Sequence, residues 1–232
     1  MHKDVVFIDL GSISYKEAWD YQEQLFNEII NSKLSNDNEK TAPDYLIFCE
    51  HFHVFTLGKN GSERNLLVNQ MFLKNKQVEF VKTNRGGDIT YHGPGQIVGY
   101  PILNLEKYVK GVKQYIYLIE ESIIDCLKLY NIKGERLEGA TGVWLDVQNK
   151  NLTRKICAIG VRTSHWVSMH GFAFNVNTDL EYFNMINPCG FVDKKVTSLE
   201  KELGEKLNIE DVKINLLNSI ANNFKMNIIY NK

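Results

Sequence analysis

A glycine-rich stretch at residues 85–101 holds side chains that could bind and orient a substrate. It reads RGGDITYHGPGQIVGYP and contains five of the 16 glycines and two of the 4 prolines of the chain. Glycine lets the backbone approach a ligand closely and reach positive φ, while Pro94 fixes a turn that presents His92. An elaborate hairpin turn would not need Arg85 and Thr90 among the glycines. The stretch therefore predicts a shaped loop at a binding site, not a strand or a helix.

The four cysteines differ in their surroundings. They are widely spaced and form no CxxC pair, which argues against a metal site and a disulfide framework and predicts reduced thiols. Cys49, Cys126 and Cys157 lie in apolar strand-like or helical runs, where cysteine is commonly a small buried hydrophobe. Cys189 lies in the turn sequence NPCG, where a thiol can be exposed. Cys189 is thus the candidate nucleophile, with an inert loop thiol as the alternative.

Several blocks of the chain resemble one family. Three of them are similar, in this order, to the signature segments of the lipoyl(octanoyl) transferases: RGGDITYHGPGQ at 85–96, KICAIGVR at 155–162 and HGFAFNVNTDLEYFNMINPCG at 170–190. Further similar segments are IDLGSISYKEAWDYQ near the N-terminus, EHFHVFTLG at 50–58 and TGVWLD at 141–146. The resemblance extends from residue 5 to about residue 200. Departures from the family's usual sequence are Phe52, Lys59 and Phe174.

The resemblance implies roles for two side chains. Cys189 would be the nucleophile, and Lys155, 34 residues earlier, would lower the pKa of its thiol. A free thiol has a pKa of about 8.5, so an attacking cysteine usually lies beside a cation or a base. Partial burial lowers the pKa of a lysine while a nearby thiolate favours its charged form, so the two groups would titrate as a pair. Without the resemblance, Lys155 would be interpreted as a solvated lysine at a strand end.

The resemblance also implies a substrate cleft. Ile159 and Phe172 could supply apolar walls, and Gly160, Gly171 and Ala173 could leave room for an acyl chain. The implied binding residues are Arg85, Gly86, Gly87, Asp88, Ile89, Thr90, Tyr91 and His92 in the loop, Ala158, Ile159 and Gly160 after the lysine, and Gly171, Phe172 and Ala173.

In the reaction that the resemblance implies, Cys189 attacks the thioester of an octanoyl group on acyl carrier protein and releases the carrier thiol. A lysine ε-amine of a lipoyl domain then attacks the enzyme thioester, with Lys155 taking a proton, and the product is an amide. The acceptors would be the lipoyl domains of 2-oxoacid dehydrogenase E2 subunits and the glycine cleavage H protein, in the first step of endogenous lipoate synthesis. No ATP, other cofactor or metal is expected. His92 could orient the amine, hold the loop or donate to an acyl oxygen, and the sequence does not choose among these roles.

Three other classes of protein are weighed against the transferase. An ATP-dependent lipoate-protein ligase or a lipoyl amidotransferase belongs to the same superfamily, and Cys189 argues against both. A non-catalytic acyl-binding module would not need Lys155 and Cys189 together. A papain-like hydrolase needs a cysteine–histidine pair with an orienting asparagine, and no recognisable signature of that kind is present.

Strands and helices must hold these side chains in place. Apolar alternation predicts strands near 5–10, 45–57, 77–84, 96–103, 142–147, 154–162 and 169–176. The polar turn QNKN at 148–151 predicts a hairpin that places Lys155 just inside the returning strand. Apolar residues at helical spacing predict helices after a cap at Ser12 or Ser14, over about 115–130 and over about 210–224. The alternation favours the α+β class, and the resemblance implies the biotin/lipoate protein ligase catalytic fold, a mixed, largely antiparallel sheet packed with helices.

The composition describes an ordinary globular protein. Its 232 residues and 26.8 kDa suit a single catalytic domain over 1–232. A hydrophobic content of 44% and a net charge of −1 indicate no general attraction to nucleic acid. No apolar run has the length of a signal peptide or a membrane span, so a cytoplasmic protein is expected. Binding of acidic protein partners would need a local basic patch, for which the candidates are Lys59, Arg64, Lys82, Arg85, Lys107, Lys110 and Lys113. The alternative for the last three lysines is a solvated face without a binding role.

Overall fold

A large mixed sheet forms the centre of the molecule. The computed structural model describes residues 2–35, 42–187 and 195–230. The strands of this sheet are β1 (Lys3–Ile13), β2 (Asp44–His51), β6 (Gln96–Ile102), β7 (Glu135–Leu137), β8 (Ala140–Leu145), β9 (Arg154–Ser164), β10 (Val167–Asn175), β11 (Lys195–Val196) and β12 (Met226–Tyr230). Their order is β12-β1-β2-β6-β10-β9-β8-β7, with β11 pairing β9. β1 is parallel to β2 and to β12, β11 is parallel to β9, and the remaining pairs are antiparallel.

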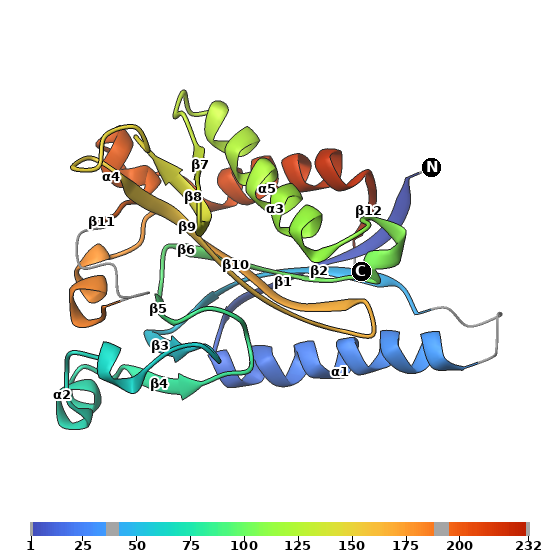
Figure 1. The fold of residues 1–232 in the computed structure, drawn as a ribbon, viewed down its shortest axis with the longest axis horizontal. Helices are drawn as coiled ribbons and strands as arrows, with labels where there is room; N and C mark the ends of the chain where they lie inside the picture. Colours follow the sequence, from blue (N-terminus) through green and yellow to red (C-terminus); the bar gives the residue numbers. More distant parts are fainter. Residues whose placement is uncertain (1, 36–41, 188–194, 231–232) are drawn as a thin grey trace.

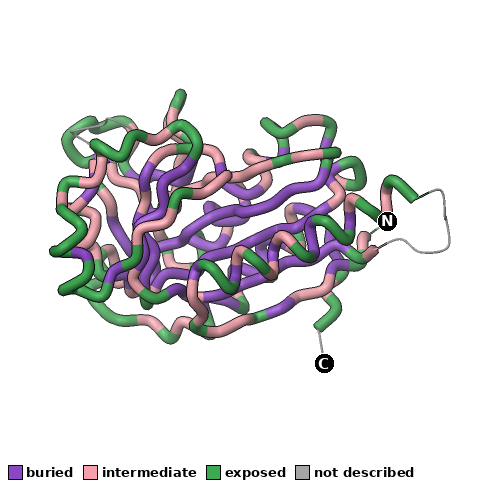
Figure 2. Tube along the Cα trace, turned by 90° about the horizontal axis from the view of Figure 1, so that it is seen from below, coloured by how far each residue is buried: buried purple, intermediate pink, exposed green. Residues whose placement is uncertain are grey.

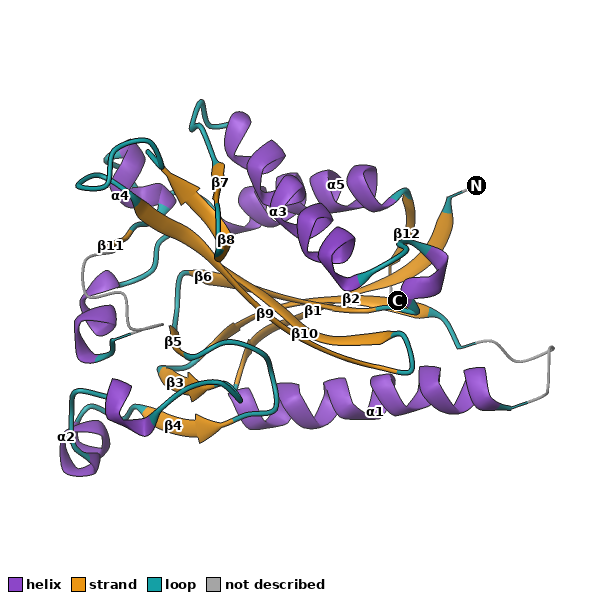
Figure 3. Cartoon of the chain, viewed as in Figure 1, coloured by secondary structure: helices purple, strands orange, loops and turns teal. Residues whose placement is uncertain are grey.

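Three long helices cover the two faces of this sheet. α1 (Tyr15–Leu34) runs along one face, and α3 (Val112–Lys128) and α5 (Ile209–Phe224) lie on the other (Figure 1, Figure 3). The side chain of Ser14 caps α1 by accepting from the backbone N–H of Glu17, which decides between the two predicted caps. The helices α2 (Gln70–Asn75) and α4 (Leu199–Leu203) are short. The predicted α+β class, with a mixed and largely antiparallel sheet, is confirmed.

Side-chain alternation in the central strands builds a core on each face. In β2, Leu46 and Phe48 pack in the cluster that includes α3 and α5, whereas Ile47 and Cys49 pack in the cluster that includes α1. Successive side chains of a strand point to opposite faces, so a strand covered on both sides is apolar without interruption. Figure 2, seen from the side of α1, shows the buried central strands behind this helix, whose residues alternate between buried and exposed.

A second, smaller sheet lies beside the first and contains part of the glycine-rich stretch. Its strands are β3 (Val54–Leu57), β4 (Glu79–Lys82) and β5 (Ile89–His92), in the order β4-β3-β5. The prediction of one strand over 45–57 is wrong, because the chain bends after His51 and enters the second sheet. The shaped loop predicted for the glycine-rich stretch is wrong at 89–92, which forms a strand and pairs with β3, whereas the strand predicted over 96–103 is present as β6. Tertiary pairing overrides the local glycine signal here.

The hairpin predicted over 142–162 is present. β8 and β9 are antiparallel, with Trp144 opposite Lys155, and the backbone turns back through a hydrogen bond from Thr153 N to Asn149 O at 2.9 Å. β11 pairs with the same part of β9, with Val196 opposite Lys155. Lys155 is therefore held in a strand with a neighbour on each side.

None of the helices in the described ranges is both long enough and apolar enough to cross a membrane.

Candidate active site

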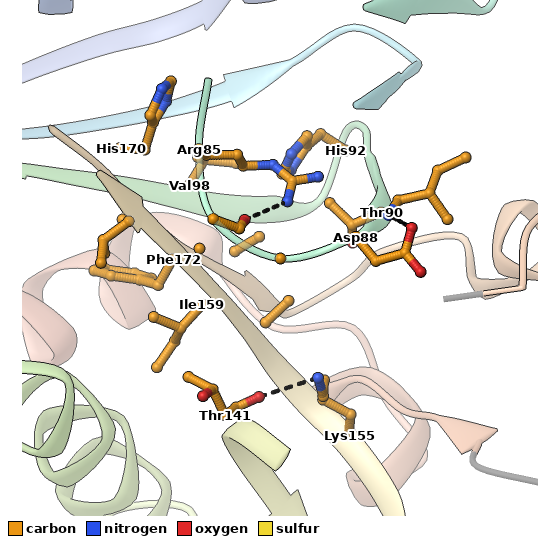
Figure 4. Close-up of a pocket in the computed structure, with 18 of the residues that line it drawn as sticks. Arg85, Asp88, Thr90, His92, Val98, Thr141, Lys155, Ile159, His170 and Phe172 are labelled. Atoms are coloured by element: carbon orange, nitrogen blue, oxygen red, sulfur yellow. Dashed lines mark hydrogen bonds between the residues drawn. The ribbon is translucent and has the colours of Figure 1, made fainter. Parts of the chain in front are cut away.

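A cavity of about 460 Å³ lies where the two sheets meet. This volume is in the range of small-molecule sites in proteins. Its walls come from segments that are distant in sequence: the loop before β5, the centre of β9, the second half of β10 and the inner face of β6. Figure 4 shows His170, Arg85 and His92 towards one end, Phe172 and Ile159 in the middle, and Thr141 with Lys155 at the other end.

The fold brings nearly all of the sequence-predicted site residues to this cavity. Those that line it are Lys155, Arg85, Gly86, Gly87, Asp88, Ile89, Thr90, His92, Ala158, Ile159, Gly160, Gly171, Phe172 and Ala173. Cys189 lies outside the described residues. Tyr91 does not line the cavity: its ring stacks on Tyr182 at 4.7 Å between centroids, and its hydroxyl bonds to His53 at 2.7 Å. Alternation along β5 accounts for this, because Thr90 and His92 face the cavity and Tyr91 faces the core of the small sheet.

Arg85 shapes the loop from within. Its side chain is buried, and its Nη2 donates to the carbonyl of Thr56 at 2.6 Å and to the Thr56 hydroxyl at 2.8 Å. The loop is also tied to β9 through Gly86 N to Val161 O at 3.0 Å, and to the small sheet through Lys59 N to Arg85 O at 2.9 Å. Arg85 therefore cannot contribute to a basic surface patch, which corrects that part of the expectation.

Two glycines at the site allow the backbone of a neighbouring segment to pass close to them. A Cβ added to Gly160 would lie 2.8 Å from the carbonyl oxygen of Gly86, and one added to Gly171 would lie 2.1 Å from that of Gly99. Both distances are shorter than side chains tolerate. The expectation that Gly160 and Gly171 leave room for an acyl chain thus needs correction, because the space beside them is taken by protein backbone.

Three buried histidines lie near the polar end of the cavity and are held neutral. Burial, followed by the charges of His51 and Arg85, keeps the pKa of His92 well below its ordinary value. Burial lowers the pKa of His51 to about 4. Burial, with the positive charge of Arg85 next, lowers the pKa of His170 to about 3. His92 Nδ1 bonds to Gln96 Oε1 at 2.8 Å and its Nε2 lies 3.2 Å from the Thr56 hydroxyl, so its ring is fixed in place.

Lys155 is positioned at the opposite end by a carbonyl and a ring. Its Nζ donates to the backbone carbonyl of Thr141 at 3.1 Å and lies 4.5 Å from the centre of the Trp144 ring. Both partners favour the positive charge of an ammonium group. Gly142 makes the approach possible: its φ is +119°, and an added Cβ would come within 2.5 Å of the Cys157 carbonyl oxygen. The side chain is half-buried.

The described cysteines are unsuited to nucleophilic attack. Cys49, Cys126 and Cys157 are fully buried, as the sequence predicted. Burial raises the pKa of Cys126 to about 12 and raises the pKa of Cys49 and Cys157 further. A neutral buried thiol is a poor nucleophile at physiological pH.

Sequence reasoning missed several residues that line the cavity. They are Tyr15, Gln96, Val98, Tyr100, Ile116, Gly139, Ala140, Thr141, Trp144, Val161, His170, Asn175, Phe183, Lys195 and Val196. Tyr15, Thr141, Trp144 and His170 lie in segments that resemble the family, which was a usable signal. Ile116 had no such signal, because its position depends on how α3 packs over the sheet.

The fold and the cavity define a known class of catalytic domain. Residues 14–221 match the family model described as the lipoyl protein ligase A/B catalytic domain, and the chain belongs to that family. Among curated proteins, it is 51% identical over 234 residues to a Christiangramia forsetii protein and 52% identical over 233 residues to a Flavobacterium psychrophilum protein. Each alignment covers 99% of this chain and 100% of the relative, and both relatives are named octanoyltransferase.

Solved structures share this fold at low sequence identity. A bi-partite lipoate protein ligase from Thermoplasma acidophilum is similar with a TM-score of 0.73 and 13% identity, over 99% of this chain and 87% of that one. A lipoate-protein ligase A bound with ATP is similar with a TM-score of 0.70 and 13% identity, over 100% and 89% of the two chains. At this identity the likeness concerns the fold alone.

Proposed function

We propose that this chain transfers an octanoyl group from octanoyl-acyl carrier protein to a lysine of a lipoyl domain, the first step of endogenous lipoate synthesis. The observation that carries the proposal is the identity of about half of all positions, over the full chain, to proteins named octanoyltransferase. The cavity supports it, since apolar side chains line its middle and a lysine stands at one end. The proposed acceptors are the lipoyl domains of 2-oxoacid dehydrogenase E2 subunits and the glycine cleavage H protein.

In the proposed mechanism, the Sγ of Cys189 attacks the carbonyl carbon of the carrier thioester. A carbon–sulfur bond to the Cys189 thiolate forms and the bond to the carrier sulfur breaks. The departing carrier sulfur takes a proton from the Lys155 ammonium group, which leaves Lys155 neutral for the second step. The acceptor ε-amine then attacks the enzyme thioester, an amide bond forms, and the Cys189 thiolate is released. The amine loses a proton in this second step, and Lys155 is the group proposed to take it.

The described surroundings of the cavity support this assignment. None of the three described cysteines offers an accessible thiol. The chain reaches the cavity on both sides of residues 188–194, because Phe183 before them and Lys195 and Val196 after them line it. Lys155 lies beside Val196 in the sheet, so the proposed partner of Cys189 belongs to the same wall.

An ATP-dependent lipoate ligase is the second candidate, because the fold is shared with a ligase that is described as bound with ATP. The two functions differ in how the acyl group is activated. A transferase receives it as a thioester, whereas a ligase must first convert a free acid into an adenylate. A requirement for ATP therefore separates them.

The test incubates the purified chain with octanoyl-acyl carrier protein without ATP, followed by intact-mass measurement. The wild type is expected to gain one octanoyl group, which a lipoyl domain then removes. Cys189→Ala is expected to gain none, and Cys126→Ala, which removes a buried thiol, is expected to behave as the wild type. A wild type that stays unmodified and transfers nothing until ATP and free octanoate are added would overturn the proposal in favour of the ligase.

A further inference from the structure

Three buried polar atoms belong to side chains that meet around His170, which lines the cavity at the end away from Lys155 (Figure 4). They are Trp19 Nε1, Gln22 Nε2 and His170 Nδ1, and none has a hydrogen-bond partner among the residues that the structure describes. Buried polar groups in proteins are nearly always paired, so three such atoms in one place need a physical explanation. His170 is 1% exposed and lines the cavity, which links the cluster to the proposed binding site.

The three side chains meet because α1 packs across β10. Trp19 and Gln22 are three residues apart on α1 and so lie on one face of the helix. The backbone N–H of His170 donates to Gln22 Oε1 at 3.1 Å, although the two residues are 148 positions apart. The ring centres of Trp19 and His170 are 6.0 Å apart.

The hydrogen-bonding capacity of the cluster is defined by its other contacts. Since Gln22 Oε1 accepts from His170 N, the amide nitrogen of Gln22 is the end that remains to donate. Asn84 Oδ1 accepts from His170 Nε2 at 2.6 Å, so His170 Nδ1 carries a lone pair. The imidazole is neutral at physiological pH because burial and the charge of Arg85 lower its pKa to about 3. The cluster therefore presents two donors and one acceptor.

One water molecule complements this set, because it can accept two hydrogen bonds and donate one. Of the other polar groups at this end, His92 bonds to Gln96 at 2.8 Å, and the Tyr100 hydroxyl donates to His51 at 2.6 Å while its oxygen faces the Gln22 side chain. An alkyl chain, by contrast, can satisfy none of the three atoms.

We infer that Trp19, Gln22 and His170 hold a water molecule that closes this end of the cavity and limits the length of the acyl chain that the site accepts. This inference deepens the proposed function and rests on it for the direction of the chain, with the acyl carbonyl towards Lys155. Phe172 and Ile159 lie between the two ends and would contact the alkyl carbons (Figure 4). A chain longer than octanoyl would have to displace the water and leave its partners buried and unpaired.

The first test compares the binding of octanoate and decanoate by titration calorimetry, which requires no turnover. The wild type is expected to bind octanoate at least about tenfold more tightly, since one unpaired buried group typically weakens binding by about that factor. Trp19→Phe removes one donor and keeps most of the ring, and Gln22→Leu removes the other. Each is expected to reduce the octanoate preference by about fivefold or more. Trp166→Phe is the matched control, because Trp166 is exposed in the turn between β9 and β10, and it should keep the wild-type preference.

The second test observes the water directly. The chain has 3 tryptophans, so its NMR spectrum contains three indole N–H signals, and Trp19→Phe identifies that of Trp19. A long-lived water contact is expected at this proton, retained with octanoate and lost with decanoate.

Equal affinity of the wild type for the two acids, or an unchanged preference in both Trp19→Phe and Gln22→Leu, would overturn the inference. Absence of a water contact at the Trp19 indole would overturn it as well. Neither readout uses the transfer reaction. The calorimetry and NMR results could agree with the expectation while the carrier protein donates no acyl group to the enzyme. In that case the inference about the water-binding end of the cavity would be supported and the proposed transferase function would be wrong.

Discussion

At the scale of single residues, Lys155 is fixed by one carbonyl and one ring. The Thr141 carbonyl accepts from its Nζ and the Trp144 ring lies beneath it, so these two groups hold the amine at the cavity. Arg154, its neighbour in β9, points to the other face of the strand and pairs with Glu202 and Asp146. The strand thus separates a structural cation from the one that we propose to act in catalysis.

A substitution that removes the Lys155 amine tests its proposed role in catalysis. Lys155→Met is expected to slow the formation of the octanoyl-enzyme by about a hundredfold or more, the usual effect of losing a general acid–base group. Rapid-quench mass measurement in a single turnover gives the rate. Lys150→Met, in the exposed turn of the hairpin, is the control and should react as the wild type. A Lys155→Met protein with the wild-type rate would contradict the role.

The buried histidines predict a pH dependence of stability. The folded-state pKa is depressed to about 4 for His51 and about 3 for His170, so between those values and about 6.5 the unfolded chain binds more protons. Their contribution is complete above about pH 6.5 and is lost as the pH falls towards the folded-state values. Between pH 6.5 and 5 the free energy of unfolding should fall by roughly 1–2 kcal/mol for each histidine.

Urea unfolding at pH 7.5, 6.5 and 5 measures this loss. His51→Gln should be less stable at pH 7.5 but should show a shallower decline with falling pH. A wild-type stability that is constant from pH 7.5 to 5 would show that these histidines are not held neutral by burial.

At the scale of elements, the site depends on how closely the glycine loop approaches β9. Gly86 N bonds to Val161 O, and the carbonyl of Gly86 passes over the Cα of Gly160. The loop therefore follows the backbone of β9 directly, and one wall of the cavity is made by this contact.

Adding a methyl group at Gly160 tests the contact. Gly160→Ala would place a Cβ 2.8 Å from Gly86 O and 3.3 Å from Arg85 Cδ, so the loop must move. We expect a loss of about 2 kcal/mol in the free energy of unfolding, as for other overpacked sites, together with weaker octanoate binding. Gly111→Ala, where an added Cβ meets nothing within 4 Å, is the control and should cost at most about 1 kcal/mol as a helix cap. Equal effects of the two substitutions would contradict the close approach.

At the scale of the whole molecule, the chain has a net charge of only −1, so the proposed recognition of acidic partner proteins would depend on a local basic patch. Two of the lysines considered for a basic patch are paired: Lys82 lies 2.6 Å from Glu63, and Lys107 lies 3.0 Å from Asp44. Lys59 is exposed and its backbone bonds to the loop at Arg85, which places it beside the cavity.

The effect of reversing a lysine's charge on the KM for the carrier protein should therefore depend on how close that lysine lies to the cavity. Lys59→Glu is expected to raise the KM for the acyl carrier protein by about threefold to tenfold at low salt, and less at 0.3 M salt, because exposed charges are screened. Lys113→Glu, at the start of α3, should change the KM by less than about twofold. Steady-state transfer at two salt concentrations gives both values, and an equal effect at the two positions would contradict a local patch at the cavity.

Much of the local structure followed from the sequence. Periods of 3.6 and 2 located the three long helices and most strands, and the turn at 148–151 located the hairpin that carries Lys155, because these signals depend on neighbours in the chain. The blocks of family sequence contain most of the residues that line the cavity, but fewer than half of the lining residues were predicted by name. The loop prediction failed at 89–92, where pairing with β3 makes a strand.

Only the tertiary structure decided which way these residues face and what they meet. In the folded chain, Tyr91 points into the core of the small sheet and Arg85 is buried against Thr56. Protein backbone lies beside Gly160, where an acyl chain was expected. The tertiary structure also brought Gln22 to His170, which no local pattern predicts. The physical reason is that the order of strands in the sheet differs from their order in the chain, so residues far apart in sequence become neighbours when the sheet forms.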